Sequence, residues 1–195
     1  MSWEPASLPE VAELFAQVRL PWWIAGGYAI ELAVGRAFRE HADVDVLLLR
    51  RDQHAVQEAL PSWEWWAADP PGTLRPWARG EVLGDDVDDV WCRPSAAAPW
   101  RIQFMLDRAE GDEWVARRNP AVRREIALLG RISAEGVPYL APEVQLYAKA
   151  HGTRPKDEQD FAAALPVLDA TQRHWLADAL PPGHPWQPAL SRGRS

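Results

Sequence analysis

Two glycines and two aspartates lie in one stretch of the sequence, at spacings suited to phosphate chemistry. Gly26 and Gly27 follow a short apolar run and precede a segment of helical periodicity, and Asp43 and Asp45 open an apolar run that ends at Leu49. The first N–H groups of a helix bind phosphate oxygens, and residues without side chains let a phosphate approach the backbone closely. The glycines are therefore candidates for a triphosphate cradle.

The two aspartates are predicted to act as a pair. Residues i and i+2 of a strand point to the same side of a sheet, so the carboxylates of Asp43 and Asp45 would lie side by side. Such a pair is repulsive unless a cation lies between the two groups or one of them binds a proton. Magnesium is the expected cation, because it prefers oxygen ligands and usually binds through a few carboxylates and substrate phosphates.

The order of these features resembles the nucleotidyltransferase superfamily signature, in which a glycine pair and a spacer precede Asp-x-Asp on the next strand. The residues from Trp23 to Leu32, Gly35-Arg36, and the run from Arg39 to Asp45 are similar to the aminoglycoside and lincosamide nucleotidyltransferase-like branch. The resemblance implies an α/β (α+β) fold, with a mixed sheet, flanking helices and a small C-terminal helical bundle. It also implies magnesium-dependent transfer of a nucleoside monophosphate, AMP from ATP, to a hydroxyl of a small molecule such as an aminoglycoside-type antibiotic.

The resemblance implies a third carboxylate, which would act as a general base on a later strand. Gln103 stands at the expected position, and Asp107 is the nearest acid on the same face of the predicted strand from Arg101 to Asp107. Either Asp107 is the base or the third acid is missing. Asp86 and Asp88, in an acidic run, are spare candidates for the same role.

Three basic residues are candidate phosphate contacts. Arg39 and also Arg36 precede the aspartate pair, and Lys149 falls in a predicted C-terminal helix whose surroundings resemble the family's helical part. Lys149 could reach the triphosphate as a point charge, or it could be a surface lysine. The run from Lys156 to Asp160 carries further charges, which could form pairs on an exposed helix face without any function.

Two alternatives to the small-molecule transferase remain open. Without a base, proton removal from an alcohol would be slower by about 10²- to 10⁴-fold, so the protein could be a catalytically weak nucleotide-binding module. The second is a toxin–antitoxin-type nucleotidyltransferase that modifies a partner protein. The acidic run 85–89 has two interpretations as well, recruitment of a polycationic acceptor or a solvated loop.

Composition excludes several other classes of protein. The net charge of −7 argues against a nucleic-acid surface, and no apolar run approaches the roughly 20 residues that span a bilayer. The N-terminus does not resemble a signal peptide, and Cys92 is the only cysteine, so a cytoplasmic location is expected. The five histidines lack zinc-ligand spacing, and the 12 tryptophans are expected mainly in core and groove packing.

Local signals divide the chain into a nucleotidyltransferase-like core at 1–140, a helical part at 141–180, and a loose, proline-containing tail at 181–195. Ser7 and Asp169 are predicted to begin capped helices, and Gly35 to end one. Helices are also predicted after Asp52, Pro142 and Lys156, together with strands at 22–25, 43–49, 62–67, 81–83, 90–92 and 101–107 and a hairpin at 128–140.

Overall fold

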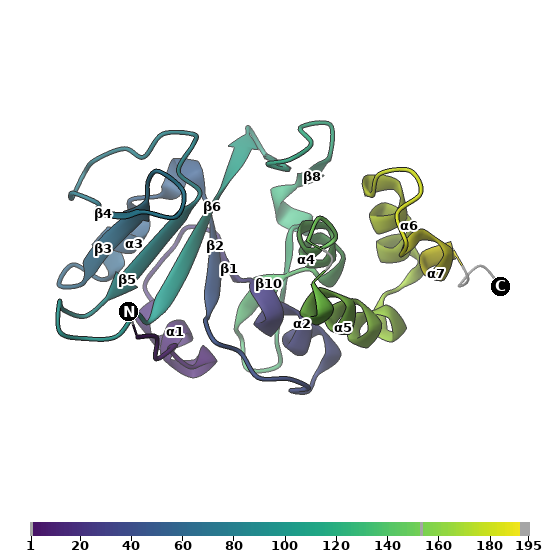
Figure 1. Ribbon diagram of the computed structural model, residues 1–195, viewed down its shortest axis with the longest axis horizontal. Coiled ribbons are helices and arrows are strands. Elements are labelled where there is room, and N and C mark those ends of the chain that lie inside the picture. The colour runs from purple at the N-terminus through teal and green to yellow at the C-terminus, as the bar shows by residue number, and fades with distance from the viewer. Residues whose placement is uncertain (1, 153, 192–195) are drawn as a thin grey trace.

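A mixed sheet beside a group of C-terminal helices makes up the computed structural model, which describes residues 2–152 and 154–191 (Figure 1). In these residues the sheet has ten strands, with the order β4-β3-β5-β6-β2-β1-β10-β9, and β7 and β8 extend it from the end of β6. The strands are β1 Trp22–Ile24, β2 Asp45–Leu49, β3 Glu64–Ala68, β4 Leu74–Pro76, β5 Asp89–Arg93, β6 Ile102–Glu110, β7 Glu113–Val115, β8 Arg123–Glu125, β9 Gly130–Ile132 and β10 Pro138–Leu140. The predicted α+β fold is confirmed.

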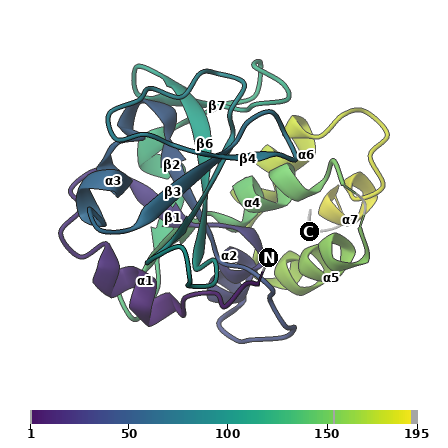
Figure 2. The same ribbon diagram turned by 60° about the vertical axis from the view of Figure 1, so that its left-hand side comes forward.

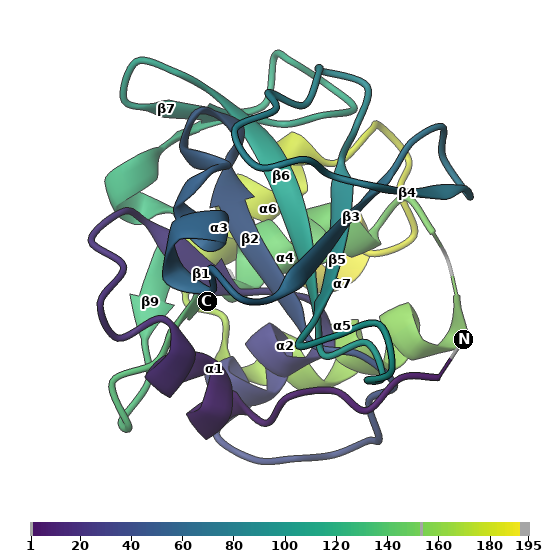
Figure 3. The same cartoon turned by 90° about the vertical axis from the view of Figure 1, so that its left-hand side faces the viewer.

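The helices form two groups on opposite faces of the sheet. They are α1 Leu8–Leu14, α2 Gly26–Val34, α3 Ala55–Ala59, α4 Pro142–Lys149, α5 Pro155–Ala164, α6 Ala170–Ala179 and α7 Gln187–Ser191. Figure 3 shows α1 and α3 in front of the sheet and α6 and α7 behind it. Figure 2 shows α4 next to the sheet, with α6 and α7 on its outer side. None of the helices in the described part of the chain has the length and apolar content that a bilayer crossing requires.

The period of two along β2 assigns its side chains to the two faces. Val46 and Leu48 pack in the core that α1 and α3 cover, whereas Leu47 and Leu49 pack in the core on the side of α2 and α4. Asp45 shares the face of Leu47 and Leu49, so it points toward the side where the glycine turn and the C-terminal helices lie. This face carries the candidate site.

Strand register places residues from distant parts of the sequence at one level. β2 runs parallel to β6, with Asp45 beside Gln103 and Leu49 beside Asp107. On its other side β6 is antiparallel to β5, with Met105 opposite Asp89. These six residues therefore have known positions along the sheet relative to one another.

Several local predictions are confirmed by the structure. Ser7 and Asp169 each form a capping box at the start of α1 and α6, and Gly35 ends α2 in the left-handed conformation. The predicted hairpin exists as β9 paired with β10. The helix boundaries at Pro142 and near Lys156 are also close to those of α4 and α5.

Other local predictions were wrong. Residues 81–83 form no strand, and the helix expected after Asp52 starts later, with His54 as its N-cap. The predicted loose tail from 181 instead contains α7, because Trp186 and Leu190 are buried in the core of the helical side. Trp186 stacks on Phe161 with ring centroids 4.2 Å apart. Residues 192–195 of the predicted tail lie outside the described residues.

Tryptophans contribute to both cores, as the sequence predicted. Trp22, Trp65 and Trp77 are buried on the α1 side of the sheet, and Trp114 and Trp186 on the helical side. Edge-on ring pairs such as Trp65 with Trp77, at 6.2 Å between centroids, join neighbouring elements. Packing thus accounts for these five side chains.

Candidate active site

The turn into α2 requires glycine. Gly26 has a φ of +66°, and a Cβ placed there would lie 2.2 Å from Oδ2 of Asp45. A Cβ on Gly27 would lie 2.0 Å from a guanidinium nitrogen of Arg39. The backbone N–H of Gly26 donates a 2.8 Å hydrogen bond to Oε1 of the buried Gln145 on α4. The turn is therefore held from both the sheet and the helical side.

The aspartate pair faces a cavity next to this turn. Asp45 is the first residue of β2, and Asp43 precedes the strand rather than belonging to it. Both residues line a cavity of about 420 Å³. The structure brings six of the seven predicted site residues to this one cavity, and they are Gly26, Gly27, Arg39, Asp43, Asp45 and Lys149.

The electrostatics of the pair favour a cation. Burial and the neighbouring charge of Asp43 raise the pKa of Asp45 to about 7, even though Lys149 and Lys156 act in the opposite direction. A bound divalent cation would remove this penalty on the second carboxylate. The described residues contain no group of three or more His, Cys, Asp or Glu that could hold a metal. Two carboxylates fit magnesium when nucleotide phosphates and water complete its shell.

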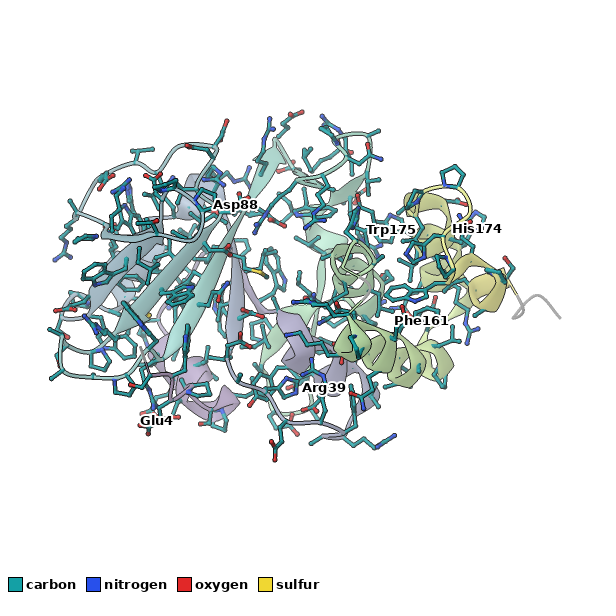
Figure 4. All side chains as sticks on the ribbon, viewed as in Figure 1. Glu4, Arg39, Asp88, Phe161, His174 and Trp175 are labelled. Carbon is teal, nitrogen blue, oxygen red and sulfur yellow. The ribbon has the colours of Figure 1, made fainter. Side chains whose placement is uncertain are left out.

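Three basic side chains of the cavity belong to one ion-pair network with two buried carboxylates. Arg39 binds Asp160 through two hydrogen bonds of 2.7 and 3.0 Å, and Lys149 Nζ lies 2.7 Å from the same carboxylate. Arg154 binds Asp157 in the same two-bond manner, at 2.7 and 3.2 Å. Figure 4 shows Arg39 at the lower edge of the molecule, beside α2 and α5.

The predicted exposed-face pairing within the run from Lys156 to Asp160 was therefore wrong. The side chains of Asp157 and Asp160 are fully buried. Asp160 pairs with Arg39 and Lys149 from other elements, and Asp157 pairs with Lys149 and with Arg154, the N-cap of its own helix. Three cations share these two anions, so the network presents excess positive charge to the cavity. It also holds Arg39 and Lys149 in fixed positions, which lowers the entropic cost of binding a phosphate.

Glu31 organises the basic loop between α2 and the aspartates, a role that the sequence did not reveal. Its Oε1 atom accepts the backbone N–H groups of Phe38 at 2.9 Å and Arg39 at 3.2 Å. The same oxygen lies 3.1 Å from Nε2 of His41. Glu31 thus positions the loop that leads into Asp43. Arg36, also considered as a phosphate contact, is exposed and does not line the cavity.

Asp107 does not lie near the aspartate pair. It is beside Leu49 while Asp45 is beside Gln103, so four residues, or about 13 Å at 3.3 Å per residue, separate their levels on the sheet. Asp107 is buried, accepts a 2.7 Å hydrogen bond from Nε1 of Trp114, and pairs with the guanidinium of Arg117. The register thus separates Asp107 from the aspartate pair, and its role as the base stays a prediction.

Asp89 is the carboxylate that the sheet places closer to the pair. It lies opposite Met105, and its Oδ1 atom accepts a 3.2 Å hydrogen bond from Nε2 of Gln103. Burial raises the pKa of Asp89, and its charge in turn raises the pKa of Asp45. The sequence had placed Asp89 in the acidic run just before the predicted strand 90–92. Starting that strand one residue earlier would have put it on the face of the site.

Comparison with known proteins identifies the fold that carries this site. Residues 7–69 match the family model described as aminoglycoside-2''-adenylyltransferase. The structure of ANT(2")-Ia in complex with adenylyl-2"-tobramycin superposes with a TM-score of 0.56 at 13% identity, covering 88% of this chain and 94% of that one. The fold is that of the nucleotidyltransferases. The lincomycin-bound lincosamide antibiotic adenylyltransferase LnuA gives the same TM-score at 14% identity, covering 86% and 100%.

The match to the family model covers the glycine turn, the aspartate pair and the loop between them. The predicted resemblance to the aminoglycoside and lincosamide nucleotidyltransferase-like branch is thus confirmed. No curated protein matches the whole sequence significantly.

Unlike Asp89, the acids Asp86 and Asp88 of the run 85–89 do not point to the site. Arg50, which is buried, donates hydrogen bonds to the carbonyl oxygens of Gly84 at 2.6 Å and Val87 at 2.7 Å, and to Oδ1 of Asp88 at 2.9 Å. Asp86 is exposed. Figure 4 shows Asp88 near the upper end of the sheet, well separated from Arg39. Asp86 and Asp88 are therefore poor choices for the third carboxylate.

Proposed function

We propose that this protein transfers a nucleoside monophosphate, AMP from ATP, to a hydroxyl group of a small molecule and releases pyrophosphate. The observation that carries this proposal is the convergence of the glycine turn and the two aspartates on one cavity. Basic side chains held by buried anions line the same cavity. The fold and the family-model match agree with this chemistry.

Each part of the cavity has a role in binding the nucleotide. Asp43 and Asp45 would hold magnesium, which when bound neutralises phosphate charge and orients the reacting groups. The N–H groups at the start of α2 beyond Gly26, whose own N–H is bonded to Gln145, would bind phosphate oxygens together with the guanidinium of Arg39, which lies against Gly27. Lys149 and Arg39, which share the buried carboxylate of Asp160, would add fixed positive charge to the cavity.

Asp89 is the best-placed general base. In the transfer, the acceptor oxygen forms a bond to the α-phosphorus, the bond from that phosphorus to the bridging oxygen breaks, and pyrophosphate leaves. The proton of the acceptor hydroxyl would pass to Asp89. Burial raises the pKa of this carboxylate, which improves its match to a base that works near neutral pH. Gln103 would orient it through their hydrogen bond.

The acceptor class is suggested by the relatives. The description of the family model names an aminoglycoside, and the two solved structures contain adenylyl-2"-tobramycin and lincomycin. An antibiotic with a free hydroxyl is therefore the first acceptor to test, and antibiotic resistance is the cellular outcome to measure.

Isothermal titration of ATP, with and without magnesium, tests the nucleotide half of the proposal. We expect magnesium-dependent binding by the wild-type protein and by Asp86→Asn, in which an exposed acid outside the cavity is neutralised. The same change at Asp45 should abolish the magnesium dependence. Equal ATP affinity of all three proteins, with or without magnesium, would rule out the site.

Pyrophosphate release distinguishes the transferase from the one alternative that an observation favours. That alternative is a nucleotide-binding module without catalysis. It is favoured because the residue beside Asp45 on β6 is Gln103 rather than an acid. Release of pyrophosphate that depends on an added hydroxyl compound selects the transferase. Tight ATP binding without release, over a panel that includes lincomycin, tobramycin and both neutral and acidic glycosides, selects the binding module.

A further inference from the structure

A second cavity adjoins the one just described and has a different chemical character. It has a volume of about 400 Å³ and lies between the face of β6 and α4. Asp89, the proposed base, lines only this second cavity. The two cavities share five lining residues, which are Gln103, Met105, Gln145, Ala148 and Arg154. If the first cavity holds the nucleotide, as proposed above, the second is where the acceptor would lie.

The charges of this second cavity do not suit a polycation. Its lining has the guanidinium groups of three arginines and only two carboxylates, Asp89 and Asp107. Asp107 already accepts hydrogen bonds from Arg117 and from Nε1 of Trp114. Only Asp89 would remain for the several ammonium groups of an aminoglycoside, and that residue is needed as the base.

Arg118 supplies a positive charge at the same cavity without a carboxylate beside it. It is exposed, and no ion pair of Arg118 is found among residues 2–152 and 154–191. Burial raises the pKa of Tyr147 and lowers the pKa of His151, and the positive charge of Arg118 acts to lower both. A free guanidinium beside a cavity is a binding group for carboxylate, sulfate or phosphate oxygens.

Tyr147 provides an independent indication that a ligand binds in the second cavity. The residue is 4% exposed, and its hydroxyl is buried without a hydrogen-bond partner in the described part of the chain. A buried hydroxyl without a partner is destabilising, so such groups are rare unless something else satisfies them. Its ring also packs edge-on against Trp114, at 6.4 Å between centroids.

The rest of the lining is apolar. Leu140 and Val144 are almost fully buried, and Trp114 is 4% exposed. Together with Met105 they form a surface that suits an aromatic or aliphatic group of the ligand.

We propose that the acceptor is an acidic hydroxyl compound with an apolar or aromatic group, and that Arg118 and Tyr147 bind its acidic oxygens. This inference rests on the proposed function and replaces the polycationic acceptor that the family resemblance suggests. A hydroxyl near Asp89 and an acidic group near Arg118 would set the orientation of the acceptor across the cavity.

Three probes of similar chemistry test the charge preference. Each is titrated into the wild-type protein with magnesium and ATP omitted: 4-nitrophenyl β-D-glucuronide, the neutral 4-nitrophenyl β-D-glucoside, and tobramycin. We expect the glucuronide to bind about tenfold more tightly than the glucoside, the scale of one charge-assisted hydrogen bond, and tobramycin not to compete with it. The glucuronide preference should disappear in Arg118→Gln.

Matched variants separate binding from folding. Arg108 is exposed on β6 and lines neither cavity, so Arg108→Gln is the control for lost charge and should bind the glucuronide like the wild type. Tyr147→Phe should weaken glucuronide binding several-fold while its thermal midpoint stays the same or rises, because the unpartnered hydroxyl is gone.

The outcomes distinguish this inference from the proposed function. Tighter binding of tobramycin, equal binding of glucuronide and glucoside, or no binding of any probe would overturn the acceptor assignment. Magnesium-dependent ATP binding is measured in separate titrations of the same protein preparations. Its result does not depend on the probe titrations. Its loss would overturn the proposed function, whatever the probes do.

Discussion

Replacing Asp45 by asparagine is predicted to stabilise the metal-free protein above neutral pH. The pKa of Asp45 is raised from 3.8 to about 7, by burial and by the charge of Asp43. Between these two values the native state keeps a proton that the unfolded chain has released. The free energy of unfolding therefore falls as pH rises from about 4 to about 7 and stays low above that range.

The magnitude follows from the pKa difference. Raising a pKa from 3.8 to about 7 corresponds to roughly 4 kcal/mol at most, at about 1.4 kcal/mol for each pH unit. Asparagine cannot ionise, so Asp45→Asn should recover about 1–4 kcal/mol at pH 8 and little at pH 4. Its amide still has to find partners in the cavity, which sets the lower end of this range.

Urea unfolding in EDTA at pH 4, 6 and 8 measures this effect. The quantity of interest is the difference in unfolding free energy between variant and wild type, because other titrating groups then cancel. We expect this difference to grow in favour of the variant from pH 4 to pH 8. Magnesium with ATP should stabilise only the wild type. A difference that does not change with pH would refute the electrostatic account of the site.

Three further substitutions test other parts of the site. Gly26→Ala introduces a Cβ at positive φ and against Asp45, so it should lower the free energy of unfolding by at least about 1 kcal/mol and weaken ATP binding in titration; normal ATP affinity would show that the turn can move aside. Asp89→Asn should keep ATP binding but slow pyrophosphate release by about 10²- to 10⁴-fold, in a stopped assay with saturating acceptor; an unchanged rate would exclude Asp89 as the base. Asp160→Asn leaves the charges of Arg39 and Lys149 with less compensation and should destabilise the protein by about 3–5 kcal/mol in urea unfolding, unless added ATP restores it. A midpoint equal to that of the wild type would show that the network contributes no stability.

Features specified by neighbouring residues could be predicted from the sequence. The capping boxes at Ser7 and Asp169 and the C-cap at Gly35 involve only residues three or four positions apart. The glycine turn and the aspartates were found for the same reason, since one strand-turn-helix-strand unit contains them. Such signals depend on local geometry that the sequence carries directly.

Features that depend on register or on distant partners could not be predicted in the same way. Choosing Asp89 over Asp107 requires the pairing of β5 with β6, which no local pattern specifies. The charge of Asp160 suggested an exposed helix face, but its partners come from the loop after α2 and from α4. Trp186 made the tail part of the core through contact with Phe161, 25 positions earlier in the sequence.

Helix α4 takes part in both cavities. Gln145 binds the glycine turn on one side, and Tyr147 lines the second cavity on the other, within a helix of 8 residues. A short helix moves as a rigid rod, so a shift imposed at one end of it is transmitted to the other. Occupancy of either cavity should therefore alter the affinity of its neighbour, and by thermodynamic reciprocity both ligands would feel the same coupling.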